Sequence, residues 1–76
     1  MYAQQLESEL LEIGLFVLSV KEIDYGQQIR LGCGAIVAVY DKGTVLVQGK
    51  LHPESREDSL MKLKRVLPRE TRWCLK

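Results

Sequence analysis

The clearest pattern in the chain is a pair of apolar runs on either side of a short polar turn. Residues 35–40 and 44–49 are rich in valine and other apolar residues, and residues 41–43 read Asp-Lys-Gly. Such runs predict two antiparallel strands. A three-residue connection whose last residue is glycine favours a type I turn that ends in a bulge. The sequence therefore predicts a β-hairpin over residues 35–49.

This turn also predicts which residues of the two strands lie opposite each other. Counting outward from the turn gives the pairs Tyr40–Thr44, Val39–Val45, Ala38–Leu46, Val37–Val47 and Ile36–Gln48. Successive residues of a strand alternate between its two faces, so the four valines share one face. We expect helices to cover this valine face. The opposite face, here called the open face, carries Ile36, Ala38, Tyr40, Thr44, Leu46 and Gln48.

Two segments carry the three- and four-residue apolar spacing of amphipathic helices. The first spans residues 2–13, and Gly14 follows it in a place that favours the left-handed conformation. The second begins after His52-Pro53 with Ser55 as its N-cap, and it stops at Pro68. The two apolar stripes comprise Ala3, Leu6, Leu10 and Ile13 in the first helix, and Leu60, Leu63, Val66 and Leu67 in the second.

Three further strands complete the pattern. Residues 15–21 are an apolar run, which predicts a strand with both faces partly covered. Residues 24–26 form a turn, and residues 27–33 then alternate, with Arg30 on the polar side. Residues 70–76 alternate again and predict a short terminal strand. The order α-β-β-β-β-α-β predicts one two-layer α+β domain over residues 1–76, with an antiparallel sheet of four to five strands and both helices on one face.

Composition places the chain among ordinary globular proteins, because 46% of its residues are apolar and 28% are charged. No apolar run approaches the roughly 20 residues that span a bilayer. The most apolar segment follows an acidic stretch, unlike a signal peptide. We therefore expect a soluble, cytoplasmic protein that does not enter a membrane.

Charge is unevenly distributed along the chain. Residues 1–24 hold five acids and one lysine, a balance of −4, whereas residues 60–76 hold six basic residues and one acid, a balance of +5. Such asymmetry can indicate a surface for nucleic acid or for an acidic partner. Part of it has a simpler reading, because acids at the start and bases at the end of the second helix complement the helix dipole.

No catalytic or metal-binding pattern is present in the sequence. His52 is the single histidine, and Cys33 and Cys74 fit no C-x-x-C spacing. The carboxylates form no acid–base pair, and the glycines lack the strand-to-helix context of a phosphate loop. We therefore expect no enzyme, no metal, no cofactor and no small-molecule substrate. We expect the cysteines to be free thiols, since a disulfide would require the last strand to lie beside Cys33.

The hairpin and the strand end that follows it resemble a known module. The segment GAIVAVYDKGTVLVQGK resembles TATA-binding-protein-like modules, and it is most similar to the small N-terminal domain of type HIII ribonucleases H. The matching positions are Ile36, Val37, Val39, Tyr40, Gly43, Val45, Val47, Gln48, Gly49 and Lys50. The resemblance implies a curved antiparallel sheet whose exposed concave face contacts nucleic-acid duplexes. The chain departs from that family in its strand at residues 15–21, its terminal strand and its lack of a duplicated half.

Two hypotheses of different classes follow. In the first, a non-enzymatic module contacts nucleic acid through the open face and nearby cations. In the second, apolar residues of the same face mediate homodimerisation or bind a protein partner, as in a regulatory adaptor. The candidate binding residues are Arg30, Ile36, Tyr40, Lys42, Thr44, Leu46, Gln48 and Lys50. Tyr40 suits either base stacking or capping of the hairpin, and the side of the sheet on which Arg30 lies depends on a register that the sequence leaves open.

Overall fold

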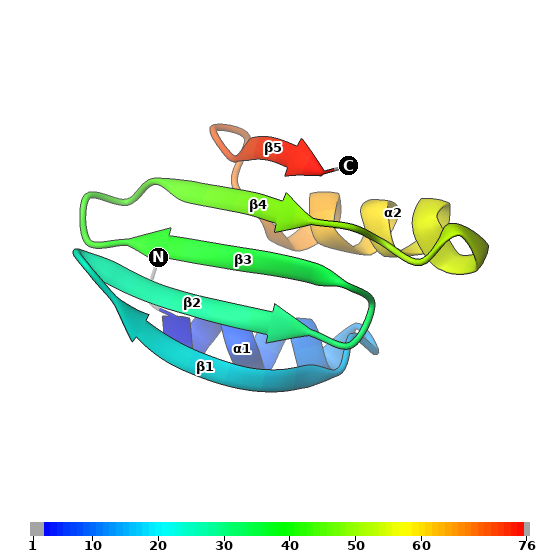
Figure 1. Ribbon diagram of the computed structural model, residues 1–76, viewed down its shortest axis with the longest axis horizontal. Helices are drawn as coiled ribbons and strands as arrows, with labels where there is room; N and C mark the ends of the chain where they lie inside the picture. Colours follow the sequence, from blue (N-terminus) through cyan, green and yellow to red (C-terminus); the bar gives the residue numbers. More distant parts are fainter. Residues whose placement is uncertain (1–2, 76) are drawn as a thin grey trace.

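The structure is a computed structural model that describes residues 3–75. A five-stranded sheet forms one layer, and two helices form the other (Figure 1). The predicted two-layer α+β fold and the predicted order of elements are confirmed. Tyr2 and Lys76, which the predictions include, lie outside the described residues. The elements are α1 (Ala3–Glu12), β1 (Val17–Ile23), β2 (Gly26–Leu31), β3 (Ala35–Tyr40), β4 (Val45–Gly49), the 3₁₀ turn η1 (Pro53–Ser55), α2 (Arg56–Val66) and β5 (Arg72–Leu75).

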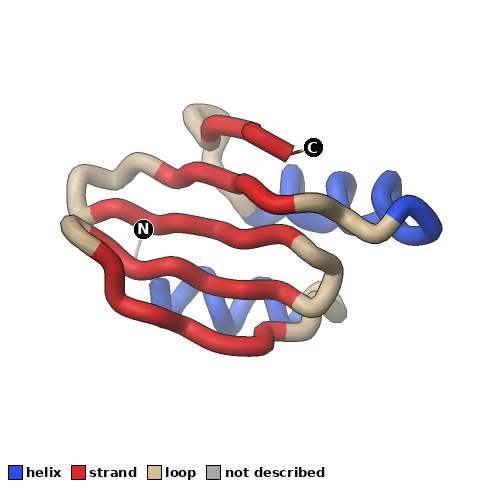
Figure 2. Tube along the Cα trace, viewed as in Figure 1, coloured by secondary structure: helices blue, strands red, loops and turns tan. Residues whose placement is uncertain are grey.

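The strands lie in the order β1-β2-β3-β4-β5 (Figure 2). The first four form an antiparallel meander, as predicted. The terminal strand β5 differs from the prediction of a wholly antiparallel sheet, because it pairs parallel to β4. The reason is the helix between them: α2 carries the chain back to the end of the sheet where β4 began, so β5 runs in the same direction as β4.

The hairpin of β3 and β4 has the predicted register. Ala38 pairs with Leu46, Val37 pairs with Val47, and the other predicted strand pairs are present as well. At the turn, the Tyr40 N–H donates to the Thr44 carbonyl over 2.9 Å, and the Gly43 N–H donates to the Tyr40 carbonyl over 2.9 Å. Gly43 has a φ of 92°, in the left-handed region that the predicted turn requires of it.

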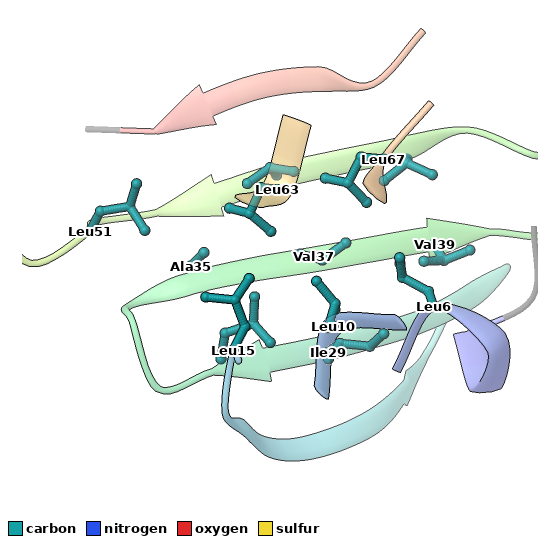
Figure 3. Close-up of a cluster of buried hydrophobic side chains, with 13 residues drawn as sticks. Leu6, Leu10, Leu15, Ile29, Ala35, Val37, Val39, Leu51, Leu63 and Leu67 are labelled. Atoms are coloured by element: carbon teal, nitrogen blue, oxygen red, sulfur yellow. The ribbon is translucent and has the colours of Figure 1, made fainter. Parts of the chain in front are cut away.

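The core lies between the valine face and the two helices. Figure 3 shows Leu6 and Leu10 of α1 and Leu63 of α2 among side chains of the strands. Val37 and Val47 in the centre of the sheet are fully buried, as are Leu6, Leu10 and Leu63. These residues belong to one continuous apolar cluster. The predicted placement of the valines beneath the helices is therefore confirmed.

The first strand is less covered than its apolar sequence suggests. Five of the seven residues of β1 are exposed, so the prediction of two partly covered faces is wrong. β1 is an outer strand of the sheet and pairs only with β2 among the described strands. Leu18 lies in an irregularity of that pairing, between Val17 and Ser19, and is 62% exposed. An apolar run does not predict whether its strand lies in the centre or at the edge of a sheet, because that position depends on long-range pairing.

The structure also describes the predicted N-cap of the second helix and the two cysteines. Ser55 stands at the N-cap position of α2 but makes no side-chain capping hydrogen bond, so that prediction is wrong. Ser55 is the last residue of the Pro53–Ser55 turn, which leads directly into the helix. Its backbone therefore lacks the extended conformation that is typical of an N-cap residue. Cys33 and Cys74 are both free thiols. Cys74 lies on β5, three strand positions away from β2, and Cys33 follows the end of β2.

Candidate functional site

Cross-strand pairing arranges the residues of the open face in rows. One row crosses all five strands through Arg30 of β2, and the next row crosses them through Ala38 of β3. Both helices lie on the opposite side of the sheet (Figure 1). The first row is Ser19, Arg30, Ile36, Gln48 and Cys74, and the second is Lys21, Gln28, Ala38, Leu46 and Arg72.

Three cations and no carboxylate lie in these two rows. Arg30 is exposed in the first row, and Lys21 and Arg72 are exposed at the two ends of the second. Four strand spacings of about 4.8 Å separate those two ends, so the backbone positions of Lys21 and Arg72 lie roughly 19 Å apart. Within the rows that the structure describes, the side chains therefore offer positive charge only, on both margins of the sheet and near its middle.

The centre of the open face has an uncharged floor. Ala38 is fully buried, yet it is absent from the apolar core cluster beneath the helices. Its larger row neighbours Gln28 and Leu46 are half-buried, and so is Ile36. The small alanine is thus covered by side chains of its own face. The accessible surface at the centre of the open face is therefore a mixture of aliphatic and amide groups.

A pocket lies at the end of the open face where the β1–β2 and β3–β4 turns meet. Its volume is about 390 Å³, and its lining consists of Tyr25, Tyr40, Lys42 and Thr44. We call it the tyrosine pocket. A second, shallower hollow of about 240 Å³ lies at the other end of the face, where Leu18, Arg30 and Ile36 contribute to its lining. Two hollows therefore bracket the open face along the direction of the strands.

Tyr25 has an unusual backbone conformation for its residue type. Its φ of 66° makes it the one non-glycine residue with a positive φ among residues 3–75. Its carbonyl accepts a hydrogen bond of 2.7 Å from the Asp41 N–H, which ties the β1–β2 turn to the β3–β4 turn. The side chain of Tyr25 is 79% exposed. A bulky residue with a positive φ has a strained backbone. Because the ring is largely exposed, its burial does not offset the energy of that strain.

Most of the predicted binding residues lie together. Arg30, which the sequence left unassigned, lies on the open face because it pairs with Ile36. Leu46 and Gln48 join the same face, and Tyr40, Lys42 and Thr44 line the tyrosine pocket. Lys50 is separate from them, since it follows the last paired residue of β4, although it is exposed.

Three residues of this surface are missing from the predicted set. Lys21 and Arg72 occupy the two outer strands, and their alignment depends on strand order rather than on any local pattern. Tyr25 lies in a turn that the sequence does reveal, but the sequence gives no sign that its ring borders a pocket. Trp73 pairs with Val47, so it lies on the valine side and does not join the open face.

Other kinds of site find no support among the described residues. In residues 3–75 no group of three or more His, Cys, Asp or Glu side chains could hold a metal ion. Neither helix is long and apolar enough to cross a membrane. No family model, curated protein or solved structure matches the chain.

Proposed function

We propose that the protein is a non-enzymatic module that binds nucleic acid on the open face of its sheet. The observation that carries the proposal is the charge of the two central rows. Lys21, Arg30 and Arg72 are exposed there, and none of the ten residues that the structure places in these rows is acidic. The net charge of the chain is only +1. The two rows hold three of the eleven basic residues of the chain and none of its ten acidic residues, whereas α2, in the helical layer, carries residues of both signs.

The chemistry of the face fits a polyanion that also carries flat, polar rings. Arginine and lysine contact phosphates without regard to base sequence, and they release counterions when they do so. Between the cations, Gln28 and Gln48 offer amide groups that can donate and accept hydrogen bonds at base edges. The aliphatic floor around Ile36 and Leu46 can support the faces of bases or sugars. An extended acidic protein segment could pair with the cations, but its carboxylates would make no favourable contact with the uncharged floor.

A charge-reversal titration tests the proposal. Binding of a fluorescently labelled oligonucleotide is measured by anisotropy, and the variants are compared at about 0.1 M salt, where the screening length of about 10 Å is shorter than the molecule is thick. A titration of the wild type at about 0.01 M salt detects weak binding. We expect the double variant Arg30→Glu, Arg72→Glu to bind about tenfold more weakly than the wild type, or weaker still, because two phosphate contacts become repulsive.

A matched control separates a local contact from a change in net charge. The double variant Lys64→Glu, Arg65→Glu makes the same change of net charge in the last turn of α2, on the helical layer of the molecule. We expect it to bind much as the wild type does. Equal losses in the two double variants, or no binding of the wild type even at low salt, would contradict the proposal.

A second candidate function, homodimerisation, is favoured by the outer strand β1. Phe16 and Leu18 are 69% and 62% exposed, and Val20 is also exposed, so the edge of the sheet presents apolar side chains. Unpaired strand edges of this kind are templates for pairing with another chain. Antiparallel self-pairing centred on Val20 would place Lys21 opposite Ser19 and would bring no like charges together. Sedimentation at tens of micromolar protein tests this association, and a monomer throughout that range would rule it out.

A further inference from the structure

The tyrosine pocket has the composition of a site for one flat polar ring beside an anion. Two tyrosines, a lysine and a threonine line it, and no carboxylate does. Its volume of about 390 Å³ lies at the lower end of the range of about 300–1,000 Å³ that is common for small-ligand pockets. Asp24 and Asp41 occupy the same two turns but lie outside the lining.

We propose that the tyrosine pocket holds a single unpaired nucleobase, so that the protein binds single strands in preference to duplexes. This inference rests on the proposed nucleic-acid function and specifies its ligand. A base stacks on a tyrosine ring whatever its sequence. Lys42 lies where it can contact the phosphate next to that base, and the Thr44 hydroxyl can donate to or accept from the base edge. A base within a duplex must first leave its stack to reach such a pocket, which disfavours duplex ligands.

The backbone of Tyr25 supports a functional role for its ring. Glycine or asparagine is favoured at a turn position with positive φ, and a tyrosine there costs conformational energy. The side chain is 79% exposed, so burial in the core does not offset that cost. The hydrogen bond from the Asp41 N–H to the Tyr25 carbonyl, 2.7 Å long, holds the turn against β3 and β4. The ring is therefore kept at the margin of the pocket on a fixed backbone.

The positions of the cations give the bound strand a path. Arg30 borders the hollow at one end of the open face, and Lys42 borders the tyrosine pocket at the other. A strand lying between them would run along β2 and β3, over Gln28 and the floor at Ala38. Six strand residues span about 20 Å. An extended single strand can follow this path with its phosphates near the cations and one terminal base in the pocket.

The experiment compares Tyr25→Gly with Tyr25→Phe. Glycine removes the ring and relieves the positive φ, so this variant should be at least as stable as the wild type in urea denaturation. Phenylalanine retains a ring for stacking. The probes are an oligothymidine of about ten nucleotides and a self-complementary hairpin of equal charge. We expect Tyr25→Gly to bind the oligothymidine about 5- to 100-fold more weakly. Tyr25→Phe should bind it within about threefold of the wild type, and the hairpin affinity should change little in either variant.

Each outcome decides between the inference and the function on which it rests. Unchanged oligothymidine binding by Tyr25→Gly, together with weakened binding by the Arg30→Glu, Arg72→Glu variant, would overturn the base pocket and leave the proposed function intact. A wild type that binds the hairpin as tightly as the single strand would also overturn the inference. No binding of either probe by the wild type at low salt would remove both proposals.

A spectroscopic readout gives an independent check that does not depend on affinity. An oligothymidine with 2-aminopurine as its terminal base reports stacking through loss of its fluorescence. We expect the wild type and Tyr25→Phe to quench this fluorescence at saturation and Tyr25→Gly to leave it largely unquenched. Equal quenching by all three proteins at saturation would place the base elsewhere on the open face and overturn the assignment of the pocket.

Discussion

The two faces of the β3–β4 hairpin are built from neighbouring residues but differ in burial. Val37 and Val47 are fully buried beneath the helices, whereas Ile36 and Gln48, one position away, stay half-exposed on a face that no described helix covers. The valine face is uniform in size and polarity, as a packed core requires. The open face combines aliphatic, amide and cationic groups. The same two strands therefore supply stability on one side and a surface for recognition on the other.

Substitutions on the two faces should have different effects. A substitution on the valine face changes the packing of both helices at once, because α1 and α2 share one core cluster. A substitution on the open face changes only contacts with neighbouring strands and solvent. Stability and binding should then respond to different residues, even when those residues are adjacent in the chain.

The strongest test of this separation is a pair of neighbouring substitutions in β4. Val47→Asp places a charge in a fully buried position without a partner, which costs several kcal/mol, comparable with the whole stability of a small domain. We expect this variant to show no cooperative unfolding transition in urea. The transition is monitored by the fluorescence of Trp73. Gln48→Asp should unfold within about 1 kcal/mol of the wild type but bind oligonucleotides more weakly, since it adds a negative charge to the row of Arg30. Comparable stability losses in both variants would mean that the two faces are not distinct.

A smaller effect is expected at the exposed edge of the sheet. If β1 mediates homodimerisation, Leu18→Lys should weaken self-association about tenfold, or about 1.4 kcal/mol, because it places charge on the pairing edge. The stability of the monomer should change by less than about 0.5 kcal/mol, since Leu18 is largely exposed. Met61→Lys is the matched control, because Met61 is equally exposed but lies on α2. Sedimentation that is insensitive to Leu18→Lys, or equally sensitive to both changes, would exclude the edge as the interface.

The sequence predicted the features that depend on local geometry. A three-residue turn with Gly43 at its end permits one register, so each pair between β3 and β4 could be counted from it. The helix stripes were also predicted, because Leu6 and Leu10 in α1, and Leu60 and Leu63 in α2, recur at helical spacing. Each pair packs in the core or against it. Six of the eight predicted binding residues belong to this hairpin and share its open face or its turn. They are Ile36, Tyr40, Lys42, Thr44, Leu46 and Gln48.

The features that the sequence did not predict depend on long-range arrangement. The parallel direction of β5 follows from the path of α2, and the exposure of β1 follows from its place at the edge of the sheet. The same strand order brings Lys21 and Arg72 into one row, although about 50 residues separate them along the chain. The ring of Tyr25 borders the pocket because two turns are hydrogen-bonded to each other. No periodicity within a single segment carries this information.

If Lys21, Arg30 and Arg72 hold phosphates, binding must depend on salt concentration in proportion to these three contacts. For single strands, the slope of log K against log salt concentration is about −0.7 for each phosphate contacted. We predict that the triple variant Lys21→Gln, Arg30→Gln, Arg72→Gln has a slope smaller in magnitude than that of the wild type by about 2. An unchanged slope in a folded triple variant, with tight binding retained, would show that the phosphates lie elsewhere and that the open face is not the binding surface.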